Sequence, residues 1–421
     1  MVEATTEQGQ GASALDAGGR ARIAFVIELA RRLHQYGAAA PRLEQAIGNV
    51  SRQLNLGCDV LSTPTSIVLS FSAPHGDGIA ELTQVVRIAP GDVNLTRLCR
   101  ADEIADRVAA GSLAPRRGMA QLRALGRPLP RAALWGTIVS YGLSAASVAV
   151  LFRSSAVDAV VAGLIGLVIG AIVVAGYTRP HLSVAGDAVA ALVATFIATM
   201  ISAWVTPLAI KLVVLSALIV LVPGMSLTNA VRELTSQHLA SGVARFAGAA
   251  ATILKLTFGT IAAAQLCAVV HIVPAGHVPP PLPLLWQWPA LAVGAVAFAM
   301  LFQTALRDYP LVIGSVVFGY IVTYWGGIAM GAPFGVFIGG LVLGGGSNLY
   351  ARLAHRPGAL VREPGMLLLV PGSVGFRSVS DLLGNQLASG TQIAVLLMTL
   401  LISLVAGFLF GDLLVPPRRS L

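Results

Sequence analysis

Long apolar stretches alternate with short polar breaks from residue 132 to the end of the chain. Most of these stretches approach the roughly 20 residues that an α-helix needs to cross a bilayer. The pattern predicts ten membrane spans, five on each side of a connecting segment at 271–286 that has no Lys or Arg. The predicted spans are 132–152, 156–176, 186–205, 207–223, 246–270, 287–306, 309–325, 331–349, 360–372 and 391–413.

Residues 20–131 have a different, soluble pattern. Apolar residues recur at helical spacing in three segments, and β-branched residues gather in three short ones. The pattern predicts an α+β domain that is large enough to hold its own core. We expect helices in 21–37, 41–55 and 94–111, and two or three strands among 58–64, 66–72 and 83–89.

The first 19 residues carry acidic side chains and no apolar core. A secretory signal peptide needs such a core, so we expect residues 1–19 to be a disordered tail instead.

One segment of the chain occurs twice, 148 residues apart. Residues 219–242 align without a gap on residues 367–390, so that Pro223-Gly224 meets Pro371-Gly372 and Glu233 meets Asp381. With five spans in each copy, the second copy enters the membrane in the opposite orientation. We therefore predict an inverted 5+5 repeat, formed by 132–270 and 287–421, after a cytoplasmic α+β domain at 20–131.

Composition and charge support a membrane protein. The chain is 56% hydrophobic and 11% charged, with a mean hydropathy of +0.79. Its net charge of +9 does not indicate nucleic-acid binding, because the arginines stand before the first span and in loops between spans. By the positive-inside rule, this distribution places the N- and C-termini in the cytoplasm.

The sequence predicts no enzyme. It has no G-x-S-x-G motif, no Walker A lysine loop and no H-E-x-x-H motif. Its three cysteines are scattered without paired spacing, so we expect no disulfide framework, no metal site and no cofactor. Without a nucleotide-binding module, transport would draw on an ion gradient or on the substrate's own gradient.

The repeated Pro-Gly pairs predict broken helices in the fourth and ninth spans, because proline removes a backbone donor and glycine frees the backbone. Freed amides and carbonyls at matching breaks are suited to a zwitterionic substrate. Lys255 joins these candidates as a charge near the middle of the fifth span. The alternative for each polar residue is a helix cap or a helix interface. The substrate-binding candidates are Pro223, Gly224, Ser226, Thr228, Asn229, Arg232, Lys255, Pro371, Gly372, Ser373 and Arg377, and the proton-coupling candidates are Glu233 and Asp381.

These motifs resemble the threonine/serine exporters, in which a cytoplasmic domain and ten spans occur on one chain or are divided between two proteins. The resemblance runs from about residue 23 to residue 414. It rests on Gly37-Ala38 with Arg42-Leu43-Glu44, Thr63-Pro64-Thr65, Arg87 with Asn94-Leu95 and Leu98, Pro223-Gly224 with Asn229 and Glu233, and Pro371-Gly372-Ser373 with Gly375-Phe376-Arg377.

The resemblance implies proton-driven efflux of threonine and serine across the bacterial inner membrane. The expected partners are a small amino acid, protons, the lipid bilayer and a second copy of the chain, with no nucleic acid. Divided members are associated with succinate, so a dicarboxylate exporter stays open, as does a passive channel. A third alternative is an enzymatic or sensory N-terminal domain that the spans anchor. The two copies also differ, since Arg377 in the second copy matches Asn229 in the first.

Overall fold

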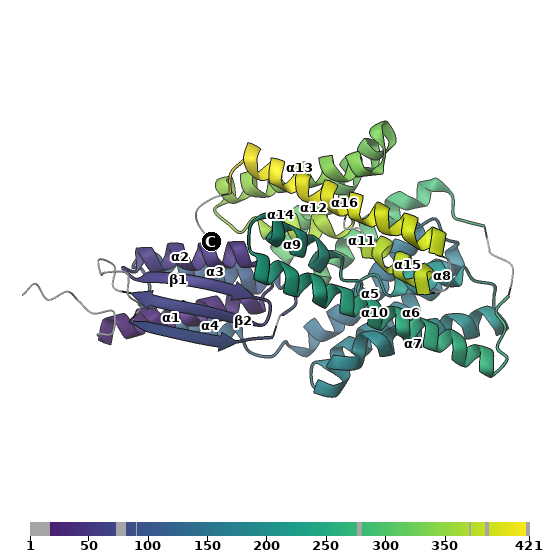
Figure 1. Cartoon of the computed structure of the whole chain (residues 1–421), viewed down its shortest axis with the longest axis horizontal. Helices are drawn as coiled ribbons and strands as arrows, with labels where there is room; N and C mark the ends of the chain where they lie inside the picture. The colour runs from purple at the N-terminus through teal and green to yellow at the C-terminus, as the bar shows by residue number, and fades with distance from the viewer. Residues whose placement is uncertain are drawn as a thin grey trace, which may run out of the picture. The chain divides into compact units, whose positions relative to one another are not determined.

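The computed structural model describes residues 17–72, 81–89, 91–275, 280–369, 372–383 and 387–417. These residues divide into two compact units. The first lies within residues 1–127 and the second within residues 128–418, to which residues 94–96 also belong. Figure 1 labels the helices and strands of both units.

The described part of the first unit contains one antiparallel sheet in the order β1-β2-β3. Val60 of β1 faces Leu69 of β2, which faces Gln84 of β3. Alternate residues of β2, Ile67, Leu69 and Phe71, are fully buried, as expected where one sheet face covers a core. The elements are α1 (Ala17–Gln35), α2 (Ala40–Gln53), β1 (Gly57–Thr63), β2 (Ser66–Ser72), β3 (Leu82–Arg87), α3 (Leu95–Ala109) and α4 (Pro115–Leu125).

Helix α4 was not expected from the sequence. The arginines of this segment were interpreted only as a topology signal, but Pro115 opens a helix that packs against α1. Leu122 of α4 is fully buried. A short amphipathic helix with one buried face therefore occupies most of the basic segment.

Cys58 on β1 provides a pH-dependent prediction. Burial raises the pKa of its thiol from 9.0 to about 11. The folded state therefore holds the proton more tightly than the unfolded state, and this contribution to stability is lost as the pH rises from about 9 to about 11. Since the thiolate is the nucleophile, alkylation of Cys58 by iodoacetamide at pH 8 should be about a hundredfold slower than in the unfolded chain. Mass spectrometry of the modified peptide, with and without denaturant, measures this ratio, and equal rates would contradict the prediction.

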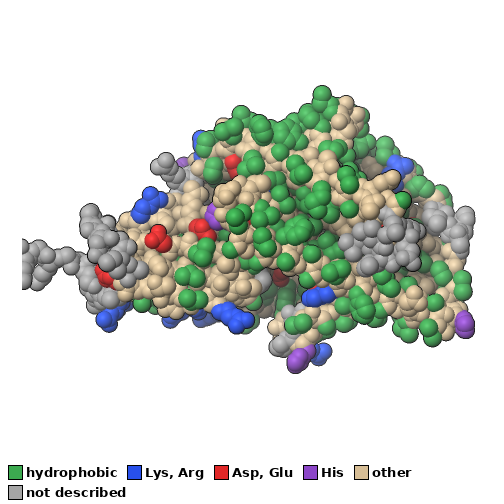
Figure 2. Space-filling view, viewed as in Figure 1, with side chains coloured by type: hydrophobic (Ala, Val, Ile, Leu, Met, Phe, Trp, Pro, Cys, Tyr) green, Lys and Arg blue, Asp and Glu red, His purple; other side chains and the backbone are tan. Residues whose placement is uncertain are grey.

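The second unit is helical. Among the described residues, eight of its helices are long and apolar enough to cross a membrane, and hydrophobic side chains cover much of the exposed face in Figure 2. The elements are α5 (Arg131–Leu151), α6 (Ala156–Gly176), α7 (Pro180–Trp204), α8 (Ile210–Ala217), α9 (Gly224–Thr235), α10 (Leu239–Val269), η1 (Leu284–Trp286), α11 (Gln287–Leu301), η2 (Leu306–Asp308), α12 (Tyr309–Met330), α13 (Ala332–Ala354), α14 (Ala359–Leu367), α15 (Gly372–Leu383) and α16 (Leu387–Leu414).

The eight long helices correspond to eight of the ten predicted spans. The other two predictions, 207–223 and 360–372, do not form continuous spanning helices. Each begins as a short helix, α8 or α14, and the chain then turns before a second short helix, α9 or α15. The sequence predicts breaks in both spans at their Pro-Gly pairs, and α9 does begin at Gly224 after a gap from Ala217, whereas Pro371 lies outside the described residues. The chain is a polytopic helical membrane protein, and the ten-span arrangement stays a prediction.

Equivalent helices of the two copies meet in pairs. Helices α9 and α15 begin and end at positions 148 residues apart, and they contact each other. The first long helices of the two copies, α5 and α11, also pack together, and the Ser147 hydroxyl donates to the Ala290 carbonyl at 2.7 Å. Two pairs of helices at corresponding places of the predicted repeats therefore contact each other, and the inverted 5+5 repeat stays a prediction.

Candidate functional site

Two helix starts define the centre of the site. Helix α8 ends at Ala217, and α9 begins at Gly224 with Pro223 as its N-cap residue. In the second copy, α14 ends at Leu367 and α15 begins at Gly372. Proline cannot donate a backbone hydrogen bond, so it is tolerated at a helix start and interrupts a helix elsewhere. Pro371 lies outside the described residues.

The two starts touch each other. A Cβ atom added to Gly372 would lie 2.8 Å from the Cα atom and 3.0 Å from the backbone nitrogen of Gly224. Only glycine permits this approach without displacing the backbone. The first amides of a helix have no partner within the helix and mark its positive end. Two such ends therefore converge where the copies meet.

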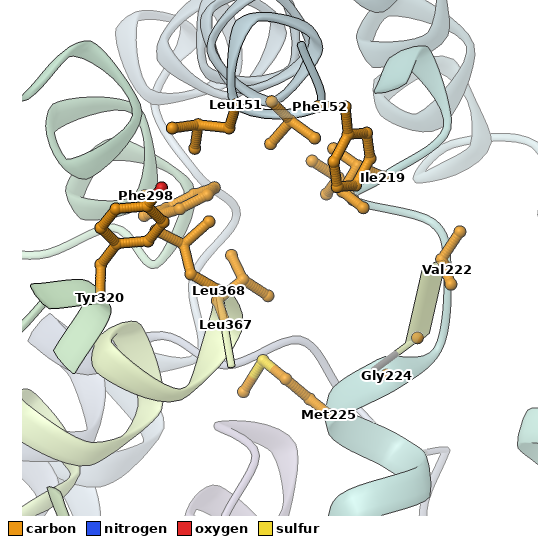
Figure 3. A pocket seen from close by; sticks show the side chains of 13 residues that line it. Leu151, Phe152, Ile219, Val222, Gly224, Met225, Phe298, Tyr320, Leu367 and Leu368 are labelled. Carbon is orange, nitrogen blue, oxygen red and sulfur yellow. The ribbon is translucent and has the colours of Figure 1, made fainter. Parts of the chain in front are cut away.

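A cavity of about 150 Å³ adjoins this contact (Figure 3). Three pairs of its lining residues are related by the 148-residue repeat, namely Ile219 with Leu367, Val220 with Leu368, and Gly224 with Gly372. Among the described lining residues, Tyr320 has the only side-chain oxygen, and no side chain is charged. The remaining lining residues are Val148, Leu151, Phe152, Val222, Met225 and Phe298.

Sequence reasoning found only part of this lining. Of the substrate-binding candidates, Gly224 and Gly372 line the cavity in the described part of the chain. The sequence analysis did not identify the aliphatic and aromatic residues that form the cavity walls. In the sequence, Phe152, Phe298 and Tyr320 cannot be distinguished from residues of a membrane span that face lipid. The signal for Leu367 and Leu368 was present, because both have apolar counterparts in the repeated segment.

Glu233 is held in a buried network on its own copy. Its side chain is 1% exposed and accepts two hydrogen bonds from the Arg245 guanidinium, each of 3.0 Å. The Ser241 hydroxyl donates a third at 2.8 Å. Protonating Glu233 would break these bonds and deprive Arg245 of its ionic partner, which argues for a structural role.

Asp381 occupies the equivalent position of the second copy and repeats half of this arrangement. The Ser389 hydroxyl donates to its carboxylate at 2.9 Å, as Ser241 does to Glu233. The position equivalent to Arg245 is Ile393. Among the described side chains, which do not include Arg377 one turn earlier on α15, no cation forms an ion pair with Asp381, and Ser389 is the hydrogen-bond donor found. The two proton-coupling candidates therefore have different surroundings.

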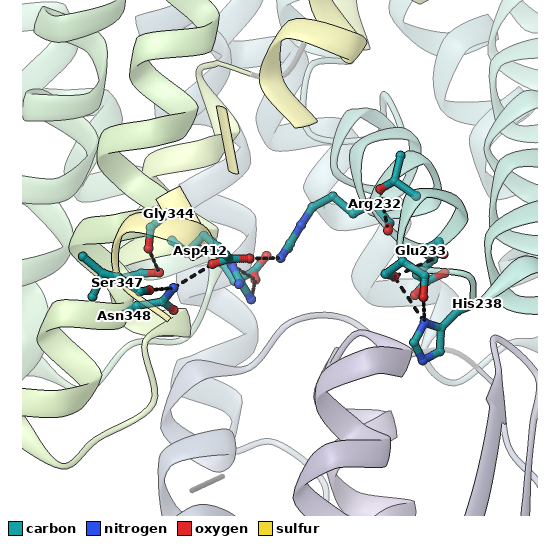
Figure 4. A network of polar contacts seen from close by, with 12 residues as sticks. Arg232, Glu233, His238, Gly344, Ser347, Asn348 and Asp412 are labelled. Carbon is teal, nitrogen blue, oxygen red and sulfur yellow. Dashed lines mark hydrogen bonds and ion pairs between the residues drawn. The ribbon is translucent and has the colours of Figure 1, made fainter. Parts of the chain in front are cut away.

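Arg232 does not line the cavity and contacts α16 instead. Its Nη2 lies 3.7 Å from Oδ2 of Asp412 on α16, as Figure 4 shows. Its guanidinium carbon lies 5.1 Å from the centre of the Phe408 ring. Asp412 is in turn bound by Asn348, whose Nδ2 donates to it at 2.6 Å. The structure thus places Arg232 in a contact between copies.

Lys255 has a partner that the sequence did not suggest. Its Nζ lies 3.6 Å from Oδ2 of Asp187 on α7 and donates to the Val184 carbonyl at 3.1 Å. Its side chain is 42% exposed. The structure does not bring Lys255 to the cavity, and an ion pair between α7 and α10 explains how its charge is tolerated.

The other candidates on α9 whose side chains are described do not line the cavity. The Thr228 hydroxyl is buried and donates to the Gly224 carbonyl within α9 at 3.2 Å. Ser226 and Asn229 lie on the same helix, partly buried and outside the lining. Ser373 and Arg377 belong to α15, but their side chains lie outside the described residues.

Comparisons with known proteins cover both copies. Residues 24–267 match the family described as "Putative threonine/serine exporter", and residues 288–414 match "Threonine/Serine exporter, ThrE". No solved structure matches.

Two curated relatives with similar sequences come from fungi. The chain is 26% identical over 393 residues to pheromone-regulated membrane protein 10 of Eremothecium gossypii, an alignment that covers 89% of this chain and 52% of that protein. The protein of that name in Saccharomyces cerevisiae is 24% identical over 382 residues, covering 89% of this chain and 48% of the relative. This chain therefore spans about half the length of these relatives. The family matches extend over nearly the whole chain, and we conclude that this multi-pass membrane protein belongs to the threonine/serine exporter family.

Proposed function

We propose that the protein is a secondary exporter of small amino acids, threonine and serine foremost, which works by proton antiport. The observation that carries this proposal is the cavity beside the contact of Gly224 with Gly372. Broken helices at matching positions of two repeats are the usual site of substrate binding in secondary transporters.

The chemistry of the cavity favours an amino acid over a dicarboxylate. The converging helix starts offer their positive ends to one carboxylate, and the carbonyls of the turn before α9 suit an ammonium group. The Gly224 amide itself donates to the Val222 carbonyl at 2.8 Å, so the carboxylate would be held by the positive ends and by the amides that follow Gly224. The described lining has no charged side chain. A second carboxylate, as in succinate, would face an apolar wall without a partner, which is costly.

The size of the cavity favours a small substrate. A cavity of this volume holds a molecule of about six non-hydrogen atoms, such as benzene. Serine and threonine are only slightly larger, so a modest adjustment of the walls admits them. Size does not separate threonine from succinate, which leaves charge as the discriminating property.

Asp381 is the better proton carrier of the two candidates. Its carboxylate accepts one hydrogen bond from Ser389, so protonation breaks no ion pair with a described residue. Glu233 would have to leave Arg245. We assign the proton to Asp381 and a structural role to Glu233.

We further propose that the two copies are inverted in the membrane and rock against each other around the cavity. The pairwise contacts of α5 with α11 and of α9 with α15 support this arrangement. The distribution of arginines supports cytoplasmic termini and a cytoplasmic domain at 20–131, followed by repeats at 132–270 and 287–421. The bacterial inner membrane stays a prediction, since the similar curated proteins are fungal.

Transport by the purified protein in proteoliposomes tests the substrate and the coupling. Vesicles loaded with labelled threonine, serine or succinate are followed with and without an imposed pH gradient. We expect the gradient to accelerate the exit of threonine and serine and to leave succinate inside. Exit of succinate alone would assign the protein to dicarboxylates, and flux indifferent to the gradient would indicate a passive facilitator.

A further inference from the structure

We propose that Arg232 and Asp412 form an ion-pair latch between the two copies, which closes one end of the path to the cavity and opens during transport. The latch rests on the proposed alternating access, but not on the identity of the substrate. Arg232 and Asp412 would act through helix positions rather than by touching the substrate.

The ion pair between Arg232 and Asp412 is weak enough to break during a conformational change. The charged groups are 3.7 Å apart, and the two side chains are 18% and 29% exposed. Partly exposed ion pairs of this kind contribute about 1 kcal/mol or less. The Phe408 ring supports the guanidinium from the same helix as Asp412, at 5.1 Å. Since Asp412 and Phe408 both lie on α16, separation of α9 from α16 breaks these two contacts together.

Asp412 is fixed to the second copy. Asn348 of α13 donates to its Oδ1 at 2.6 Å and to the Val415 carbonyl at 2.8 Å. Helices α13 and α16 also pack at glycines, where a Cβ added to Gly411 would lie 2.7 Å from the Gly345 nitrogen. Asp412 therefore moves with α13 and α16 as one body.

Arg232 is fixed to the first copy by its neighbour. The Glu233 side chain is 1% exposed and accepts two hydrogen bonds from Arg245 of α10, a stronger attachment than the partly exposed contact of Arg232 with Asp412. When the copies separate, the buried pair should persist and the contact between copies should break. Because of this difference in strength, the Arg232–Asp412 ion pair is the one expected to break when α9 and α16 separate.

Helix α9 connects the latch to the cavity. It begins at Gly224, which lines the cavity, and reaches Arg232 eight residues later, a rise of about 12 Å. Release of Arg232 frees one end of a rigid helix whose other end forms the cavity wall. The latch can thus change access to the cavity without touching the substrate.

The second copy has no equivalent latch. The positions 148 residues from Arg232 and Asp412 are Ser380 and Ala264, neither of which is charged. In an inverted repeat, these positions lie toward the opposite membrane face. The latch therefore acts at one face only, the one that the proposed orientation makes cytoplasmic.

Cysteine labelling tests the latch without a transport assay. Met225 in the cavity wall is replaced by cysteine in a chain whose Cys58, Cys99 and Cys267 are serine, and a membrane-impermeant maleimide is applied to vesicles of each orientation. From the face of Arg232, we expect Arg232→Gln and Asp412→Asn each to raise the labelling rate at least about threefold, and the double variant to raise it no further.

Matched variants separate the latch from general loosening. Arg356→Gln removes another arginine–aspartate pair, with Asp308, that lies within the second copy and should leave labelling unchanged. Arg232→Lys and the exchanged pair Arg232→Asp with Asp412→Arg should keep labelling low. The latch would be contradicted if Arg232→Gln left the maleimide labelling rate unchanged. It would also be contradicted if Arg356→Gln raised that rate by the same factor. If Arg232→Gln and Asp412→Asn raise the labelling rate as expected but the protein exports no amino acid, only the proposed substrate would be contradicted.

Discussion

Replacing Glu233 by glutamine is expected to lower the free energy of unfolding by about 3 kcal/mol. Glutamine keeps the shape of the side chain but removes the charge that Arg245 and Ser241 surround. The guanidinium of Arg245, itself only 20% exposed, is then left without its partner. Thermal unfolding of the purified protein in detergent, followed by the loss of monodisperse protein, measures the change.

Asp381→Asn is the matched control, because it makes a similar change at the equivalent position of the second copy. It affects one neutral hydrogen bond, from Ser389, and should cost about 1 kcal/mol or less. The double variant Glu233→Gln with Arg245→Gln should recover part of the loss, since it removes the unpaired charge as well. Equal destabilisation by Glu233→Gln and Asp381→Asn would contradict this assignment.

The same two variants separate stability from proton coupling. If Asp381 carries the proton, Asp381→Asn should fold normally and export threonine at a rate that no longer responds to the pH gradient. Both repeated segments have a carboxylate and a serine eight residues apart, and the segments differ at Arg245 against Ile393 and at Asn229 against Arg377. Glu233 is fixed in an ion pair with Arg245, whereas Ile393 offers Asp381 no equivalent partner.

The sequence predicted those parts of the structure that depend on local patterns. Apolar runs near 20 residues correspond to eight spanning helices, and the Pro-Gly pairs stand where α9 and α15 begin. Alternation along 66–72 corresponds to β2, with Ile67, Leu69 and Phe71 buried. These features follow from backbone geometry and residue type within a short window.

The contacts between distant residues could not be predicted in this way. Arg232 and Asp412 are 180 positions apart, and nothing in either local pattern indicates that α9 and α16 meet. Lys255 looked like an isolated membrane charge because Asp187, its partner, lies on another helix. The cavity walls likewise combine α5, α11 and α12, whose apolar residues are indistinguishable in sequence from residues that face lipid.

Adding side-chain volume at the contact of the two helix starts should abolish transport. In Gly372→Val, the new Cβ would meet Gly224 backbone at 2.8 Å and Val222 Cγ1 at 3.0 Å. Since backbone cannot rotate aside, α9 and α15 must separate, and such overpacking costs about 1–3 kcal/mol. We expect Gly372→Ala to lower the rate of threonine exit about tenfold or more, and Gly372→Val to reduce it to background, with rates normalised to the reconstituted protein.

Gly248→Ala is the control for these variants, because a Cβ added at Gly248 of α10 meets nothing within 4 Å. Alanine is favoured over glycine inside a helix by about 1 kcal/mol, so this variant should transport normally and be slightly more stable. Gly372→Ala and Gly248→Ala add the same methyl group, and only the first adds it between the copies. Normal transport by Gly372→Ala would show that transport does not need close contact between the two helix starts. It would contradict the proposal that the cavity beside this contact binds the substrate.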